Sequence, residues 1–301
     1  MGELDSGVGG YFAGMKNNSS FKKICVTVVW SWLFIFAMVP VLLTLITSFL
    51  TADSSSLVVF KPTLQNYTQL FNSAYLKILL QSLYLATSCT LLCLIIGYPF
   101  AFTIARSKSR HRALLLLLVM IPFWTSSLIR TYAIMALIKA KGILNTVLLA
   151  IGLIHHPLPI LYSYSAVLLG CVYDLLPFMI LPLYGNIEKL NPDLLEAAQD
   201  LGAGKIRTMV KVVFPLTMPG IIAGTLLVFL PAMTMFYIPV LLGGAKNLLL
   251  GNLIENQFLS ANNWPMGAAI SMLITVFMGA MILLYWRNAQ SKDKQNLQEL
   301  V

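Results

Sequence analysis

Apolar residues gather into six long runs along this chain, and shorter polar segments separate the runs. A helix needs about 20 mostly apolar residues to cross the roughly 30 Å hydrocarbon core of a bilayer. Each run is long enough to do so: 24–50, 78–105, 113–138, 163–187, 219–243 and 266–286. The runs are too long and too continuous for the alternating strands of a membrane β-barrel. We therefore expect an all-α polytopic membrane protein with about six transmembrane helices.

The segments outside the runs predict tails, loops and two short helices. Residues 1–20 are polar and glycine-bearing, so we expect a disordered cytoplasmic tail before a transmembrane domain at 21–290. A second cytoplasmic tail is expected at 291–301. After Pro62, apolar residues recur at helical spacing, which predicts a short interfacial helix. The apolar piece at 143–154 is too short to span and is expected to lie as a helix on the membrane surface.

The composition excludes an ordinary soluble domain. Hydrophobic residues make up 58% of the chain and charged residues only 10%, whereas charged residues form about 25% of a soluble domain. The mean hydropathy is +0.81. The first run exceeds the h-region of about 7–15 residues in a signal peptide, and no small-residue cleavage site follows it. We therefore expect it to be a membrane helix rather than a cleaved signal.

The formal net charge of +9 would suit a nucleic-acid-binding protein, but its distribution follows a membrane topology. If six helices start from a cytoplasmic N-terminus, most Lys and Arg residues fall on cytoplasmic segments. Such a bias sets the orientation of membrane proteins, so both termini are expected in the cytoplasm and no nucleic-acid partner is expected. The basic run 106–112 is interpreted as an anchor of this topology; phosphate binding is the alternative.

The cysteines and histidines do not predict a metal site. Cys25, Cys89, Cys93 and Cys171 all lie in apolar runs without a CxxC pair, so we expect buried free thiols. The adjacent histidines at 155–156 lack further ligands nearby. We predict that no metal is bound.

The sequence also argues against an enzyme. Gly204-Lys205 superficially resembles the end of a P-loop, GxxxxGK[ST]. Gln199 stands at the first glycine position, however, and Ile206 replaces the hydroxyl residue that would bind Mg²⁺. The three histidines offer no base beside a nucleophile. We expect no catalytic residue on this chain.

A charged segment at 188–217, called the polar segment below, separates the fourth and fifth runs. Asn191 is a good N-cap, and Gly202 is placed to end the helix that follows. A second short helix is predicted from about Lys205 to Val213, closed by Pro215. The result is a helix–turn–helix unit whose small residues would let a partner's backbone approach closely. A purely structural loop could have the same sequence.

Glu196-Ala197-Ala198, followed by Gly202 and Pro215, resembles the EAA motif of ABC importer permeases of the type I fold. The resemblance implies that these five residues form the coupling helix region, which in that family sits in a cleft of the cytoplasmic ATPase. It also implies that ATP and Mg²⁺ are used by a dimer of ATP-binding partner subunits. This chain is therefore expected to carry no cofactor.

Further segments look like the spermidine/putrescine permeases of this family, and the resemblance extends from about the first predicted helix to the sixth. These segments are 97–102, 122–130, 176–179 and 215–224. The resemblance implies a permease subunit for polyamine import in a bacterial inner membrane. It further implies a heterodimer with a second, related permease and a periplasmic polyamine-binding protein that docks on the outside loops.

Asp174 is the only acidic residue inside a predicted span. An acid there costs about 2.5–3.5 kcal/mol on insertion scales, so it is expected to face protein or water. A polyamine is a polycation whose path needs carboxylates or aromatic faces, which makes Asp174 a candidate path residue. The alternative is a structural partner, with Arg130 as the obvious candidate.

Other candidate path residues lie near the fifth helix and in the loop after it. Phe236 and Tyr237 stand between two prolines, which are expected to bend the helix against protein or a cavity. Their rings could stack on the substrate, and the resemblance implies that this part lines the path; ordinary packing is the alternative. Glu255 and Trp264 are candidates to receive substrate from the binding protein, or are simply solvated and interfacial.

Two rival functions are compatible with the sequence. Within the transporter class, the solute could be another cation, or an anion such as sulfate. From another class, the chain could work alone as a secondary transporter or channel, which predicts indifference to changes in Glu196 or Gly202. A membrane-embedded enzyme ranks behind both, because no catalytic constellation is present.

Overall fold

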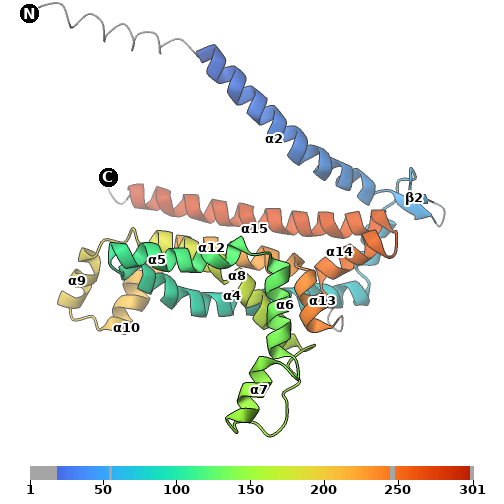
Figure 1. Ribbon diagram of the computed structural model, residues 1–301. Helices are drawn as coiled ribbons and strands as arrows, with labels where there is room; N and C mark the ends of the chain where they lie inside the picture. Colours follow the sequence, from blue (N-terminus) through green and yellow to red (C-terminus); the bar gives the residue numbers. More distant parts are fainter. Residues whose placement is uncertain (1–18, 54–55, 245–247, 299–301) are drawn as a thin grey trace, which may run out of the picture.

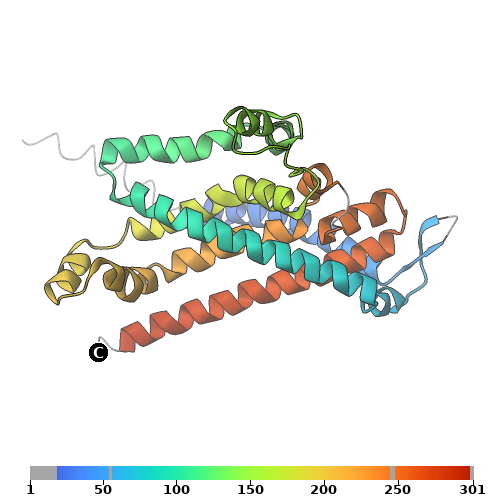
Figure 2. The same ribbon diagram turned by 90° about the horizontal axis from the view of Figure 1, so that it is seen from below.

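The computed structural model describes residues 19–53, 56–244 and 248–298, so the tail predicted at 1–20 lies almost wholly outside the described residues. Five long helices set the shape of the described part (Figure 1). They are α2 (Ser19–Ser48), α4 (Ser73–Arg106), α8 (Tyr164–Ile187), α12 (Met218–Thr234) and α15 (Trp264–Gln298). In two views, α4, α8, α12 and α15 run along one another as a bundle (Figure 2).

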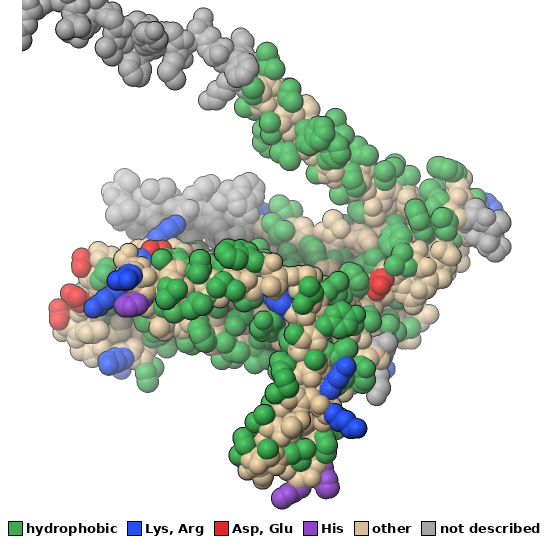
Figure 3. Space-filling model, viewed as in Figure 1, with side chains coloured by type: hydrophobic (Ala, Val, Ile, Leu, Met, Phe, Trp, Pro, Cys, Tyr) green, Lys and Arg blue, Asp and Glu red, His purple; other side chains and the backbone are tan. Residues whose placement is uncertain are grey.

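Within the described residues, five helical segments are long and apolar enough to cross a membrane: Lys23–Ser48, Ser73–Arg106, Ser127–Ala150, Tyr164–Ile187 and Trp264–Leu283. A sixth span results if the pair Lys205–Leu216 and Met218–Thr234, bent by 69°, is taken as one. Hydrophobic side chains cover the middle of the bundle, and charged ones gather at the end that carries α9 and α10 (Figure 3). The predicted all-α polytopic fold is confirmed.

The predicted third span, 113–138, is wrong as a single helix. It is divided into α5 (Ser109–Met120), the 3-10 turn η2 (Ile121–Trp124) and α6 (Ser127–Ile138). Pro122 cannot donate in the ladder, and the backbone is extended at Thr125 and Ser126, so the helix stops there. The 12 residues of α5 reach only about 18 Å. α6 turns sharply away from α5, and α7 (Ile143–Ala150) continues outward (Figure 1).

The shorter elements lie mostly at the end of the bundle opposite the polar segment. β1 (Thr51–Asp53) and β2 (Ser56–Val59) pair antiparallel. The short helix predicted after Pro62 is present as α3 (Gln65–Leu70), and the one predicted within 143–154 is present as α7. By length and composition α7 is not a separate surface helix, because it forms one candidate span, Ser127–Ala150, together with α6. α13 (Tyr237–Gly243) and α14 (Leu250–Leu259) follow α12. α14 falls in a region where the sequence predicted only a loop.

The core lies where α4, α8 and α12 meet. Cys89 and Cys93 on α4, Met179 and Leu183 on α8, and Val228 on α12 are all fully buried. The close approach of α12 to α8 depends on small residues: a Cβ added at Gly220 would lie 2.8 Å from the Cβ of Asn186. α12 and α8 therefore pack so closely at Gly220 that no side chain fits between them.

Helix α2 diverges from the bundle toward its N-terminal end (Figure 1). None of the apolar window within Lys23–Ser48 is buried, and Trp30 is 69% exposed. A helix that is apolar on all sides belongs in a membrane or against another subunit. The prediction that all four cysteines are buried is wrong for Cys25, which is exposed on this helix; Cys89, Cys93 and Cys171 are buried as predicted.

The last helix is longer than predicted. α15 runs to Gln298, past the expected end of the sixth span near residue 286 and through most of the tail expected at 291–301. Only the first part, Trp264–Leu283, is apolar enough to count as a span. The remainder continues the helix with residues that have good helix propensity, such as Lys and Gln.

Replacement of Gly220 by alanine is expected to destabilise the bundle, because the new methyl group would overlap Asn186 of α8. Overpacking of this kind costs about 1–3 kcal/mol. Gly185→Ala is the matched control: it lies on a bundle helix, yet nothing stands within 4 Å of its added Cβ. Thermal unfolding of the purified protein in detergent should show a lower midpoint for Gly220→Ala only. Equal midpoints for the two variants would contradict this account of the α8–α12 contact.

Candidate functional site

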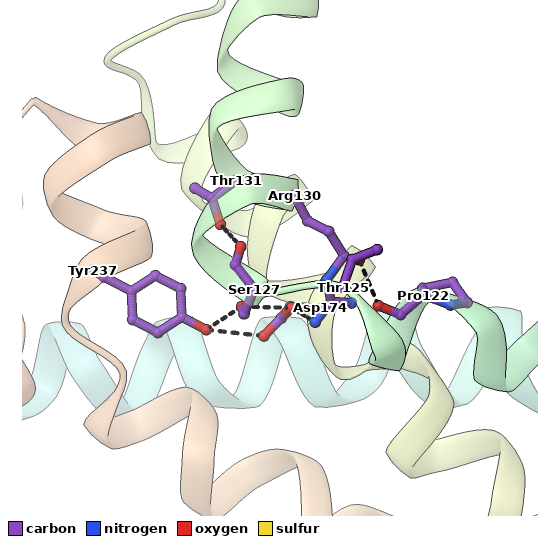
Figure 4. A network of polar contacts seen from close by, with 7 residues as sticks. All are labelled: Pro122, Thr125, Ser127, Arg130, Thr131, Asp174 and Tyr237. Atoms are coloured by element: carbon purple, nitrogen blue, oxygen red, sulfur yellow. Dashed lines mark hydrogen bonds and ion pairs between the residues drawn. The ribbon is translucent and has the colours of Figure 1, made fainter.

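A network of polar side chains joins three helices inside the bundle, with Asp174 of α8 at its centre (Figure 4). Arg130 Nη2 lies 2.7 Å from Asp174 Oδ1, and Ser127 Oγ donates to the same oxygen at 2.9 Å. Tyr237 OH donates to Asp174 Oδ2 at 3.0 Å and lies 2.5 Å from Ser127 Oγ. Arg130 and Ser127 come from α6, and Tyr237 comes from α13.

The network sits beside two helix breaks. α6 begins directly after the break that follows α5, and α13 begins directly after the break that follows α12. Met235 at the second break is extended, with φ −63° and ψ 131°. The predicted bend between the two prolines of the fifth run is therefore present. Through Asp174, both broken helices are tied to α8, which passes the site as one continuous helix.

The charges of Arg130 and Asp174 are largely removed from solvent, since the two side chains are each 10% exposed. The Arg130 guanidinium also lies 5.7 Å from the centre of the Phe123 ring and 5.9 Å from that of Tyr173. Its Nε and Nη1 atoms find no hydrogen-bond partner among the described residues. The two aromatic faces stabilise the cation where hydrogen bonds are missing.

The structure brings some of the predicted path residues together and leaves others apart. Asp174 is paired with Arg130, the structural alternative that the sequence had left open, and Tyr237 joins this pair. Phe236 is 44% exposed, and its ring meets that of Tyr237 edge to face at 5.8 Å. Trp264 packs instead on Phe258, at 6.1 Å.

Helix α14 supports the α12–α13 break from another side. Asn252 Nδ2 donates to the Phe236 carbonyl at 2.8 Å. A Cβ added at Gly251 would lie 2.1 Å from the Thr234 carbonyl oxygen, so the two backbones are in direct contact. Glu255 lies one helical turn beyond Asn252, lining a pocket between α13 and α14.

Sequence reasoning missed Ser127, Gly251 and Asn252. Ser127 ends a short polar stretch that begins three residues after Pro122. The proline and this stretch together were the signal in the sequence for a break in the third run. Asn252 and Gly251 lie on α14, where the sequence predicted only a loop. Nothing in the sequence therefore indicated that they contact the break.

The polar segment forms the predicted pair of helices at one end of the bundle. α9 (Asp193–Asp200) begins after Asn191, whose Oδ1 accepts from the Asp193 N–H at 3.1 Å. Gly202 has φ +78°, the left-handed conformation predicted for the residue that ends this helix. α10 (Lys205–Thr208), the π-turn η3 (Met209–Val213) and α11 (Phe214–Leu216) follow. The predicted second helix is thus present, with an irregular turn. The prediction that Pro215 closes it is wrong, because Pro215 stands in the first turn of α11, where no backbone donor is needed, and the helix continues to Leu216.

The outer surface of the polar segment combines charged and apolar side chains. Glu196, Ala197 and Pro215 are exposed, and Ala198 is half-buried. Apolar side chains are also open: Leu201 is 89% exposed and Ile206 is 82% exposed. Large apolar side chains this exposed, on the most highly charged end of the molecule, mark a surface for contact with a partner.

The polar segment is fixed to the bundle at two points. Glu188, at the end of α8, forms an ion pair with Arg112 of the basic run, and Arg112 Nη2 also donates to the Ala105 carbonyl at 3.1 Å. The hydroxyl groups of Tyr98 on α4 and Thr217 before α12 are 2.9 Å apart. Movement of the polar segment would therefore be passed to the helices behind it.

Comparison with known proteins gives matches over most of the chain. Residues 95–290 match the family described as "Binding-protein-dependent transport system inner membrane component". The spermidine/putrescine transport system permease protein PotB of Salmonella typhimurium strain LT2 is 50% identical over 281 residues, covering 93% of this chain and 98% of that protein. PotB of Escherichia coli K12 is 52% identical over 270 residues, covering 90% and 98%.

A solved structure has the same fold at low sequence identity. It is a chain of a bacterial ABC transporter involved in the import of the acidic polysaccharide alginate. The TM-score is 0.70 at 17% identity, and the alignment covers 93% of this chain and 98% of that one. A second structure, of bacterial alginate ABC transporter with an alginate pentasaccharide-bound periplasmic protein, matches with a TM-score of 0.65 at 17% identity, covering 88% and 92%.

Loss of one member of the Arg130–Asp174 pair should destabilise the fold more than loss of both. Arg130→Met leaves a buried carboxylate without its cation, a change that costs about 3–5 kcal/mol in buried pairs. Adding Asp174→Leu to that variant should restore much of the stability. Arg106→Met is the matched control, since Arg106 also lies over a ring, Phe102 at 5.8 Å, but is exposed.

The measurement is the thermal midpoint of each purified variant. Arg130→Met is expected to show a large decrease, the double variant a smaller one, and Arg106→Met little change. A double variant that is less stable than Arg130→Met would show that the pair is not the main interaction of these two residues.

Proposed function

Because the chain belongs to the family of binding-protein-dependent transport system inner membrane components, we propose that it forms one half of the membrane path of an ATP-driven polyamine importer. The resemblance to type I ABC importer permeases is confirmed by the family match, and the fold is that of such permeases. Identity of 50–52% to PotB over at least 90% of the chain supports a polyamine as substrate. The second half would be a related permease, in a bacterial inner membrane with both termini in the cytoplasm.

The polar segment is the part that receives work from a cytoplasmic ATPase. Its exposed apolar side chains, Leu201 and Ile206, offer a surface that another protein must cover, and this is the single observation that carries the coupling role. Glu196, Ala197 and Ala198 lie on the helix that leads to this surface. ATP and Mg²⁺ would be held by the partner subunits, which would also supply the residues that catalyse hydrolysis.

The substrate path would pass the break between α12 and α13. Phe236 presents an exposed ring there, and ring faces attract ammonium groups. Tyr237 is held by Asp174 and Ser127, so it positions the break rather than moving freely. Asp174 would act mainly by cancelling the charge of Arg130, which would otherwise repel a polycation near its route. In this proposal Asp174 is a positioning residue that need not touch the substrate.

Other functions fit these observations less well. A secondary transporter or channel that works alone has no use for the exposed apolar surface on the polar segment. A different solute, such as another cation or sulfate, would leave the coupling proposal unchanged but is less consistent with the two PotB matches.

Gly202→Asp is expected to reduce binding of the ATPase and transport about tenfold or more, the effect of losing about 1.4 kcal/mol. Asp tolerates the left-handed conformation better than most residues, so the effect is expected mainly from the charge and the side chain that it adds at the contact surface. Gly152→Asp is the matched control, because Gly152 has φ +76° and equally open surroundings but lies after α7. The measurement is co-purification of the ATPase, followed by uptake. If the ATPase co-purifies with Gly202→Asp at the wild-type level, the coupling role is wrong.

Polyamine specificity can be tested on the assembled complex in proteoliposomes. We expect a spermidine-loaded binding protein to stimulate ATP hydrolysis and spermidine uptake, and a sulfate-loaded binding protein to do neither. The physical reason is that a polycation and an anion need opposite charges along the path. The reverse pattern would assign the chain to anion import and leave its role as a permease intact.

A further inference from the structure

A pocket of about 330 Å³ lies between α13 and α14, directly beside the α12–α13 break. Its polar lining comes from Asn252, Glu255, Asn256 and Ser260, and apolar walls come from residues that include Leu248 and Leu259. This volume is at the lower end of the range of small-molecule sites, about 300–1,000 Å³. The pocket is therefore large enough for part of an extended ligand.

Asn252 lines this pocket and carries an unused hydrogen-bond acceptor. The residue is 6% exposed, and its Nδ2 donates to the Phe236 carbonyl at 2.8 Å. That bond fixes the orientation of the amide, since a carbonyl can be paired only with the NH₂ group. The other amide atom, Oδ1, is buried and has no hydrogen-bond partner among the described residues. A buried acceptor left unpaired is unfavourable, and because this oxygen is closed off from the pocket, only a shift of the amide would bring it into contact with a ligand.

Glu255 adds negative charge to the same side of α14. It is three residues after Asn252 on the helix, so the two side chains share a face. Glu255 is half-buried, and neither ion pair between described residues involves it. The pocket thus combines a carboxylate with polar amide and hydroxyl side chains, with apolar surface around them.

These features select the chemistry of the ligand. A primary ammonium group has three N–H donors and no acceptor, which complements the Glu255 carboxylate and the amide and hydroxyl oxygens of the lining. The apolar walls suit the methylene chain that carries such a group. A calcium ion would need six to eight oxygen ligands, more than the pocket supplies. An anion would meet the Glu255 carboxylate.

We infer that the α13–α14 pocket is a binding subsite for one terminal ammonium group of a polyamine, held by the carboxylate of Glu255. The inference rests on the proposed polyamine import and adds to it the residue that holds the substrate next to the break. Asn252 lines the pocket beside Glu255 and donates to the Phe236 carbonyl. Occupation of the pocket is in this way linked to the backbone that joins α12 to α13.

The test compares Glu255→Gln and Glu255→Lys with the wild type in the complete complex. Binding of radiolabelled spermidine to the detergent-solubilised complex, without the binding protein, reports the subsite directly. Loss of a charge-assisted hydrogen bond should weaken this binding about tenfold in Glu255→Gln, and the reversed charge should abolish it. Spermidine uptake with saturating binding protein should decrease in the same order. Asp53→Asn, the same loss of charge in the β1–β2 hairpin, should match the wild type in both assays.

The outcomes separate the subsite from the proposed function. If the wild-type complex takes up spermidine and Glu255→Gln binds and transports it equally well, the subsite is wrong and polyamine import stands. If the wild-type complex neither binds nor transports spermidine, polyamine import itself fails. Co-purification of the ATPase with each variant at wild-type yield shows that the complex has assembled. An equal decrease in Asp53→Asn would mean that general surface charge, not this pocket, causes the effect.

Discussion

A helix that breaks inside a bilayer must find partners for its freed amide and carbonyl groups within the protein, because hydrocarbon offers none. At the α12–α13 break, the Met235 N–H donates back to the Pro231 carbonyl at 2.9 Å. The Phe236 carbonyl accepts from Asn252 Nδ2 and from the Val240 N–H. α14 thus supports the break, because Asn252 gives the Phe236 carbonyl a second donor beside the Val240 N–H.

The buried ion pair between Arg130 and Asp174 also compensates for broken helices, because it fixes the positions of whole helices relative to one another. At a break, the backbone hydrogen bonds that would fix the direction of one helix relative to the preceding one are interrupted. α6 and α13 both follow such a break, and the side-chain contacts with Asp174 of α8 fix their directions instead. Burying two charges is unfavourable on its own, and an apolar pair could be more stable. An ion pair with two added hydroxyl contacts nevertheless accepts only one geometry, and this suits a joint whose parts must hold a defined arrangement.

The sequence predicted those parts of the fold that depend on local pattern. The all-α polytopic fold, the bend of the fifth run and the left-handed turn at Gly202 follow from hydropathy and backbone preference alone, and all three are present. The division of the third run was missed because Leu, Ile and Phe surround Pro122 so continuously that the run reads as one span. α14 was missed because its helix is stabilised by packing of Gly251 on Thr234, a contact distant in sequence. The pairing of Asp174 with Arg130 could be named only as an alternative, since sequence gives no distances.

The position of α12 explains how events at the two ends of the bundle can be linked. At one end, α12 begins at Met218, next to Thr217, whose hydroxyl meets Tyr98 and whose N–H bonds the Val213 carbonyl of the polar segment. At the other end it stops at Thr234, on which Gly251 rests. Its 17 residues form a rod of about 26 Å.

Because α12 contacts both α4 and α8, a push on the polar segment can reach the break only if α12 tilts or slides against these two helices. Close packing resists this movement at both ends of α12: Gly220 lies against Asn186 at one end, and Gly251 lies against Thr234 at the other. A displacement that started at the polar segment would therefore arrive at the backbone of the break, where Phe236 and the α13–α14 pocket lie together.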